Sequence, residues 1–204
     1  MLTRLKQKIQ SMLAAEARAA HKLGLTPNGI TIIGLILAFL SAAFYAMWQY
    51  NQFFLFLATF LLLLSGFCDA LDGVVARIYE QATVFGGFLD SLLDRYADAA
   101  VYMGIILGGL CSPSYWGMLA IIGSLLVSYS RARAEAAGIK MESIGLAERA
   151  ERMLIIVVSS LVAWQFQPTI VMTIALVVLA ILTNLTVLQR GIYVYARLKK
   201  KVVG

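Results

Sequence analysis

The chain has 204 residues, of which 61% are hydrophobic and 14% charged, with a mean hydropathy of +0.83 and a formal net charge of +6 at pH 7. This composition excludes an ordinary soluble globular domain and indicates a protein that lies in a lipid bilayer. Because the basic residues border apolar segments, the charge favours anionic head groups or a phosphorylated substrate over nucleic acid as a partner.

Residues 1–23 are the first predicted element, an amphipathic helix lying in the membrane interface. Its apolar residues recur at helical spacing among basic and polar neighbours: Leu2, Leu5, Ile9, Met12 and Leu13. Pro27 and Gly29 then predict a turn into the membrane. Asn28 and Thr31 in this turn either cap a helix or contact a ligand.

Six apolar segments follow, and each is close to the roughly 20 residues that a helix needs to cross a bilayer. We therefore predict an all-α membrane protein with an interfacial helix and six transmembrane helices within 30–196. No repeat or long polar linker divides the chain, so 1–204 is read as a single domain. The segments are 30–48, 53–77, 83–110, 115–137, 151–166 and 169–190.

The distribution of charge predicts the topology. All but one of the 17 Lys and Arg residues lie on one side if the segments alternate: before the first segment, at the ends of the second and sixth and beyond, or around the connection between the fourth and fifth. The opposite connections carry no charge and are flanked by Trp48, Trp116 and Trp164, as an interfacial aromatic belt would be. Both termini are therefore predicted to be cytoplasmic, in a multi-pass protein of the cell membrane.

Several carboxylates interrupt the second and third segments. Asp69 and Asp72 are three residues apart and Asp90 and Asp94 are four apart, so each pair projects from one face of its helix. A charge at this depth costs at least about 2.5 kcal/mol. Four converging carboxylates would either take up protons or bind hard divalent cations, with Mg²⁺ the natural candidate.

Small and basic residues accompany these acids. Gly73, Ala76 and Gly86 leave room for a ligand near the backbone, and Arg77 is a partner for phosphate oxygens. Helix packing in membranes is the alternative explanation for the small residues.

The run from Asp69 to Asp94 resembles the signature of the CDP-alcohol phosphotransferase family, D-x2-D-G-x2-A-R-x8-G-x3-D-x3-D, at every defined position. The resemblance implies a two-metal site for Mg²⁺, with Mn²⁺ as a substitute, held by Asp69, Asp72, Asp90 and Asp94. Asp94 would also be the catalytic base. The implied CDP-lipid site is Asn28, Thr31, Gly73, Ala76, Arg77, Thr83 and Gly86.

A second basic cluster surrounds the connection between the fourth and fifth segments, on the predicted cytoplasmic side. Its basic residues satisfy the positive-inside rule, and at helical spacing they also suit a phosphate group. The cluster is similar to that of phosphatidylinositol phosphate synthases and archaetidylinositol phosphate synthases, which implies inositol 1-phosphate as acceptor. The implied acceptor-phosphate site is Ser128, Arg131, Arg149, Arg152 and Arg190.

Other functions remain open from the residues alone. Glycerol 3-phosphate or serine is an alternative acceptor, and a divalent-cation transporter is the alternative outside enzymes. The lipid is either CDP-diacylglycerol or CDP-archaeol, and the family resemblance implies a homodimer. The sequence assigns no role to Arg95 or Asp98, which extend the acidic face of the third segment by one turn.

Overall fold

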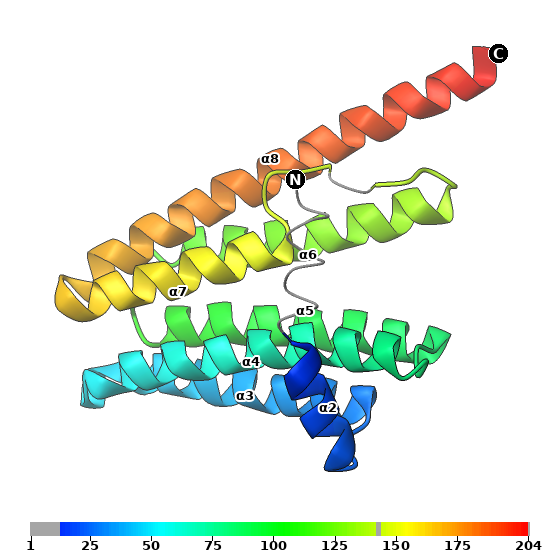
Figure 1. Cartoon of the computed structure of the whole chain (residues 1–204). Helices are drawn as coiled ribbons and strands as arrows, with labels where there is room; N and C mark the ends of the chain where they lie inside the picture. Colours follow the sequence, from blue (N-terminus) through cyan, green and yellow to red (C-terminus); the bar gives the residue numbers. More distant parts are fainter. Residues whose placement is uncertain (1–12, 142–143, 204) are drawn as a thin grey trace.

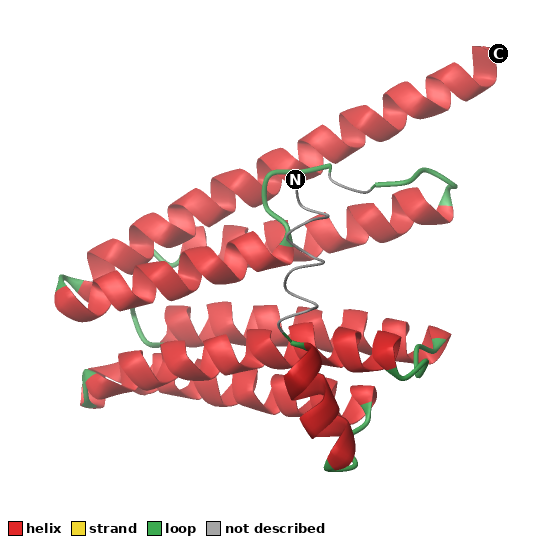
Figure 2. Ribbon diagram, viewed as in Figure 1, coloured by secondary structure: helices red, strands yellow, loops and turns green. Residues whose placement is uncertain are grey.

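The structure is a computed structural model that describes residues 13–141 and 144–203. All regular structure in these residues is helical, which confirms the all-α prediction (Figure 2). The elements are α2 (Ala14–Lys22), α3 (Pro27–Met47), the short 3-10 helix η1 (Trp48–Tyr50), α4 (Phe53–Ile78), α5 (Val84–Leu107), α6 (Tyr115–Ala136), α7 (Arg149–Gln165) and α8 (Pro168–Val203).

The long helices form two layers that run alongside each other. Helices α3, α4 and α5 make one layer, and α6, α7 and α8 make the other (Figure 1). Within the first layer α3 packs against both α4 and α5, and within the second α8 packs against both α6 and α7. Contacts of α4 with α7 and of α5 with α6 join the layers, so residues on α4, α5 and α7 can share one site.

Small residues allow α3 and α5 to approach each other closely. A methyl group added at Gly104 would collide with the backbone of Ala42, and one added at Gly108 would collide with the carbonyl of Tyr45. The buried Tyr45 hydroxyl lies 2.7 Å from the hydroxyl of Ser160, which ties α3 to α7 across the two layers. The packing therefore fixes α5, which carries three of the acids, against α3.

Three helical segments are long and apolar enough to cross a membrane, namely 27–50, 53–78 and 168–199. Large apolar side chains on these segments, among them Phe60 and Leu63, face outward. The protein is therefore an integral membrane protein. Among the other helices α5 carries four charged residues and α7 has 17 residues, so the predicted total of six spans stays a prediction.

The N-terminal element is described only from Leu13 onward, so most of the predicted interfacial helix over 1–23 lies outside the described residues. Helix α2 contacts α4 through its buried residues Ala17 and Ala20. His21 stacks on Tyr79, with ring centroids 3.6 Å apart, at the end of α4. His21 is thus a packing residue as well as a surface residue.

Two helix boundaries differ from the sequence prediction in ways that affect the site. Helix α7 begins at Arg149, two residues before the predicted segment, which places Arg149 and Arg152 in its first turns. Helix α8 continues to Val203, well beyond the predicted end at 190. Hydropathy marks only where a helix is apolar, and these polar ends continue the same hydrogen-bonded helix.

Candidate active site

Three carboxylates converge where α4 faces α5. Asp69 on α4 and Asp90 and Asp94 on α5 are half-buried, and one oxygen from each lies within 4.8 Å of the others. Asp90 Oδ1 is buried with no hydrogen-bond partner among the described residues. An all-oxygen cluster with an unpartnered buried oxygen fits a hard divalent cation.

Asp72 is the fourth acid of the signature and lies beside this cluster. Its side chain is buried, and Thr31 on α3 donates a hydrogen bond of 2.6 Å to its Oδ2. Asp72 lines one cavity together with Asp69 and Asp94, and a neighbouring cleft together with Asp90. It therefore stands between the carboxylate cluster and the cleft.

That cleft has a volume of about 200 Å³ and lies between the first turns of α3, the end of α4 and the start of α5. Every residue that the sequence assigned to the CDP-lipid site lines it. The sequence had not singled out Gln81, Ala82 and Gly87, which also line the cleft. The residues that the sequence assigned to the CDP-lipid site and that line the cleft are Asn28, Thr31, Gly73, Ala76, Arg77, Thr83 and Gly86.

Two helix N-termini border the cleft and give it a positive end. Thr26 caps α3 by accepting a hydrogen bond of 3.2 Å from the N–H of Gly29. Thr83 caps α5 by accepting one of 2.9 Å from the N–H of Gly86. Free N–H groups and the helix dipole at such ends favour anions. Together with Arg77, these helix ends suit the diphosphate of a nucleotide.

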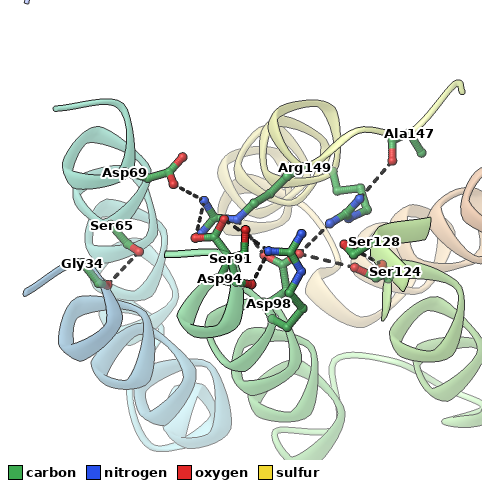
Figure 3. A network of polar contacts seen from close by, with 12 residues as sticks. Gly34, Ser65, Asp69, Ser91, Asp94, Asp98, Ser124, Ser128, Ala147 and Arg149 are labelled. Carbon is green, nitrogen blue, oxygen red and sulfur yellow. Dashed lines mark hydrogen bonds and ion pairs between the residues drawn. The ribbon is translucent and has the colours of Figure 1, made fainter. Parts of the chain in front are cut away.

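Arg149 contacts three carboxylates, one on α4 and two on successive turns of α5 (Figure 3). Its Nη1 lies 2.6 Å from Asp69 Oδ1 and 2.9 Å from Asp94 Oδ1, and its Nε lies 3.3 Å from Asp98 Oδ1. The sequence had assigned Arg149 to the acceptor and gave no sign of these contacts. The structure thus brings one predicted acceptor residue, Arg149, into contact with two predicted metal ligands, Asp69 and Asp94.

The other residues assigned to the acceptor lie on α6, α7 and α8 and have partners of their own. Arg152 is buried and pairs with Asp98 at 2.6 Å, and its Nη1 donates to the carbonyl of Ala147. Arg190 is buried on α8 and donates to the carbonyls of Ile144 and Val127.

Two further members of that set lie on α6. Arg131 is exposed and pairs with Glu135 at 2.9 Å. The Ser128 hydroxyl lies 3.5 Å from the carbonyl of Ser124 in the preceding turn. Among these residues, only Arg149 and Arg152 contact the acids of α5 in the described contacts.

Arg95, to which the sequence assigned no role, folds back on its own helix. Its Nη1 donates to the carbonyl of Ser91 and lies 3.8 Å from Asp94. Arg95 therefore adds positive charge beside the carboxylate cluster.

Residues 24–185 match the family described as CDP-alcohol phosphatidyltransferase. An archaetidylinositol phosphate synthase of Pyrococcus horikoshii is 40% identical over 206 residues, which cover 100% of both chains. One of Methanothermobacter thermautotrophicus is 44% identical over 180 residues and 88% of each chain. A phosphatidylinositol phosphate synthase of Mycobacteroides abscessus is 32% identical over 85% of this chain and 79% of its own.

Solved structures share the fold. The crystal structure of the Mycobacterium tuberculosis phosphatidylinositol phosphate synthase with CDP-DAG bound matches with a TM-score of 0.79 at 27% identity, covering 91% of this chain and 94% of that one. A structure of the same enzyme in complex with manganese and citrate also matches with a TM-score of 0.79 at 27% identity, over 90% of this chain and 88% of that one.

Proposed function

Because the chain belongs to the CDP-alcohol phosphatidyltransferase family, we propose that it transfers the phosphatidyl or archaetidyl group of a CDP-activated lipid to inositol 1-phosphate and releases CMP. Relatives named for phosphatidylinositol phosphate and archaetidylinositol phosphate synthesis support this acceptor. The observation that carries the proposal is the convergence of Asp69, Asp90 and Asp94 beside a cleft with two helix N-termini.

The carboxylates are proposed to hold two Mg²⁺ ions, for which Mn²⁺ can substitute. The cluster of Asp69, Asp90 and Asp94, with Asp72 beside it, offers only oxygen ligands, and the structural relative containing manganese supports a divalent cation here. Bound cations supply neutralisation of the diphosphate charge and make CMP a better leaving group.

The cleft is proposed to bind the CDP part of the donor. Arg77 and the N-termini of α3 and α5 would face the diphosphate, while Gly73 and Ala76 leave room on α4. The structural relative with CDP-DAG bound supports this donor class. The lipid tails of the donor would stay in the bilayer, next to the exposed apolar side chains of α3 and α4.

The proposed transfer is a direct displacement at the phosphorus that carries the lipid. An acceptor hydroxyl oxygen forms a bond to that phosphorus, and the bond from the phosphorus to the oxygen of CMP breaks. Asp94 takes the proton of the hydroxyl, because its carboxylate lies in the cluster and contacts Arg149, which is assigned to the acceptor. Arg149 and Arg152 bind the acceptor phosphate as charge-assisted hydrogen-bond donors, with Ser128, Arg131 and Arg190 completing the site.

The arrangement in the membrane is part of the proposal. Six spans would place both termini and the substrate-binding end on the cytoplasmic side of the cell membrane, as the basic residues at that end favour. The whole chain would act as one domain, and two copies would associate as the family resemblance implies.

The acceptor is tested by incubating purified protein with CDP-archaeol or CDP-diacylglycerol and one labelled alcohol at a time. We expect label from inositol 1-phosphate to enter the lipid fraction with stoichiometric release of CMP. Incorporation of glycerol 3-phosphate or serine in its place would contradict the proposed acceptor. The ratio of rates with the two donors identifies the lipid.

Replacing Gly86 with alanine is expected to raise the KM for the CDP-lipid about tenfold, since overpacking a tight contact costs about 1 to 3 kcal/mol. The added methyl group would lie 3.0 Å from Thr83 Oγ1 and 3.1 Å from Asn28 Oδ1. Gly191→Ala is the matched control, because a methyl group there also meets nothing within 4 Å and Gly191 lies on α8, outside the cleft. Equal KM values for the two variants would remove Gly86 from the donor site.

A further inference from the structure

Asp98 is a buried acid that the signature does not include. It lies on α5 one helical turn after Asp94, and its side chain is 11% exposed. Inside a membrane protein a carboxylate at such a position needs charged or hydrogen-bonding partners. The identity of those partners shows what the residue does.

The partners of Asp98 come from two other helices. Its Oδ1 lies 3.3 Å from Arg149 Nε, and its Oδ2 lies 2.6 Å from Arg152 Nη2 and 3.3 Å from the Ser124 hydroxyl (Figure 3). Both arginines are in the first turns of α7, and Ser124 is on α6. One carboxylate thus holds two guanidinium groups that would otherwise repel each other.

Two nitrogens of the Arg149 guanidinium group have different partners. Nη1 contacts Asp69 and Asp94, whereas Nε contacts Asp98, which is not a member of the three-carboxylate cluster. A cation at the cluster would compete with Nη1 for the same oxygens. The bond from Nε to Asp98 uses none of those oxygens, so it can persist when Nη1 is released.

Arg152 is more deeply buried than Arg149, with side chains 4% and 18% exposed. The whole residue is 3% exposed, its Nη2 contacts Asp98, and its Nη1 donates a hydrogen bond of 2.9 Å to the carbonyl of Ala147. Its Nε is buried without a hydrogen-bond partner in the described part of the chain. Within the described residues the Nε–H of Arg152 is therefore an unused donor, while Asp98 fixes the plane of the guanidinium group.

We propose that Asp98 is a positioning residue for the acceptor phosphate: it holds Arg149 and Arg152 side by side and keeps Arg149 anchored when a cation takes Asp69 and Asp94. This inference rests on the proposed function, in which the two guanidinium groups bind that phosphate. Asp98 acts through the arginines and does not touch the substrate.

The sign of one effect separates positioning from simple electrostatics. If Asp98 acted only by its negative charge, its removal would tighten the binding of an anion nearby. If Asp98 positions the arginines, its removal releases both and weakens anion binding. Asp98→Asn keeps the shape of the side chain and deletes the charge, so it gives opposite results in the two cases.

The test measures the dissociation constant of inorganic phosphate by calorimetry in detergent with Mg²⁺ present, together with the KM for each substrate. For Asp98→Asn we expect phosphate binding and the KM for the acceptor to worsen about tenfold, the loss typical of a charge-assisted contact. The KM for the CDP-lipid should stay within about twofold, because the donor cleft does not contain Asp98.

Two variants control this experiment. Ser124→Ala removes the neutral contact to the same oxygen and should change phosphate binding by less than about twofold. Asp98→Glu keeps the charge and displaces the carboxylate, so it should weaken phosphate binding by an intermediate factor. If Asp98→Asn does not fold, the comparison of Asp98→Glu with the unchanged protein decides the question.

Phosphate binding that is unchanged or tighter in Asp98→Asn, or equally weak in Ser124→Ala, would overturn the inference, as would an unchanged protein that binds no phosphate. Asp98→Glu with the affinity of the unchanged protein would also overturn it. Turnover with another phosphorylated alcohol would refute only inositol 1-phosphate as acceptor, because inorganic phosphate reports on the arginine pair whatever alcohol carries the group.

Discussion

Replacing Asp94 with asparagine is expected to lower the rate of CMP release about a thousandfold or more, since it removes both a proton acceptor and a cation ligand. Asparagine has nearly the same shape, so the packing of α5 should remain. Asp94 lies in the cluster with Asp69 and Asp90 and contacts Arg149 at 2.9 Å. The rate is measured on purified protein from the formation of labelled CMP.

Glu151→Gln provides the matched control for this substitution. Glu151 is an exposed acid in the first turn of α7, outside the cluster and the cleft, and its replacement makes the same change of charge. We expect its rate to stay within about twofold of the unchanged protein, as surface substitutions usually have small effects. An Asp94→Asn variant with more than a tenth of the original rate would contradict Asp94 as the base.

Removal of divalent cations by a chelator is expected to abolish turnover completely. Without them the negative diphosphate of the donor would face the carboxylates of Asp69, Asp90 and Asp94, and like charges in a partly buried site repel strongly. Adding Mg²⁺ or Mn²⁺ in excess of the chelator should restore the rate. Circular dichroism during the titration reports whether the helices persist.

The helices should persist, because Arg149 contacts Asp69 and Asp94 and compensates part of their charge when no cation is bound. A chelated protein that keeps its rate would show that the cluster is not a metal site. A protein that loses its helices on chelation would show that cations are needed for the fold.

The sequence predicted the helical class and the location of the acids for identifiable reasons. Apolar segments specify helices in a bilayer, and spacings of three and four residues place Asp69 with Asp72 and Asp90 with Asp94 on common helix faces. These are local relations along one helix, so they can be derived without a fold. The residues that the family resemblance assigns to the donor lie around one cleft, at the start of α3, the end of α4 and the start of α5.

The contacts of Arg149 could not be derived in that way. Asp69 and Arg149 are on α4 and α7, and they meet only because these two helices pack across the layers. Spacing in the sequence does not report which rotamer a long side chain adopts. The basic cluster was therefore read as one acceptor site, whereas Arg149 also contacts the acids.

The capping residues show a second limit. Thr83 was assigned to the donor by resemblance, and in the structure it lines the cleft and also caps α5. Thr26, which the sequence reading passed over, caps α3 in place of Asn28. A threonine directly before a proline and an apolar helical run is a recognisable N-cap pattern, so the signal for Thr26 was present in the sequence.

The most direct measurement of the central claim is anomalous diffraction from crystals of the protein grown with Mn²⁺. We expect manganese to be bound by oxygens of Asp69, Asp90 and Asp94, with Asp72 beside them and Nη1 of Arg149 moved away from Asp69. Manganese bound elsewhere, with Arg149 still on both carboxylates, would contradict the assignment of these acids as the metal site of the enzyme.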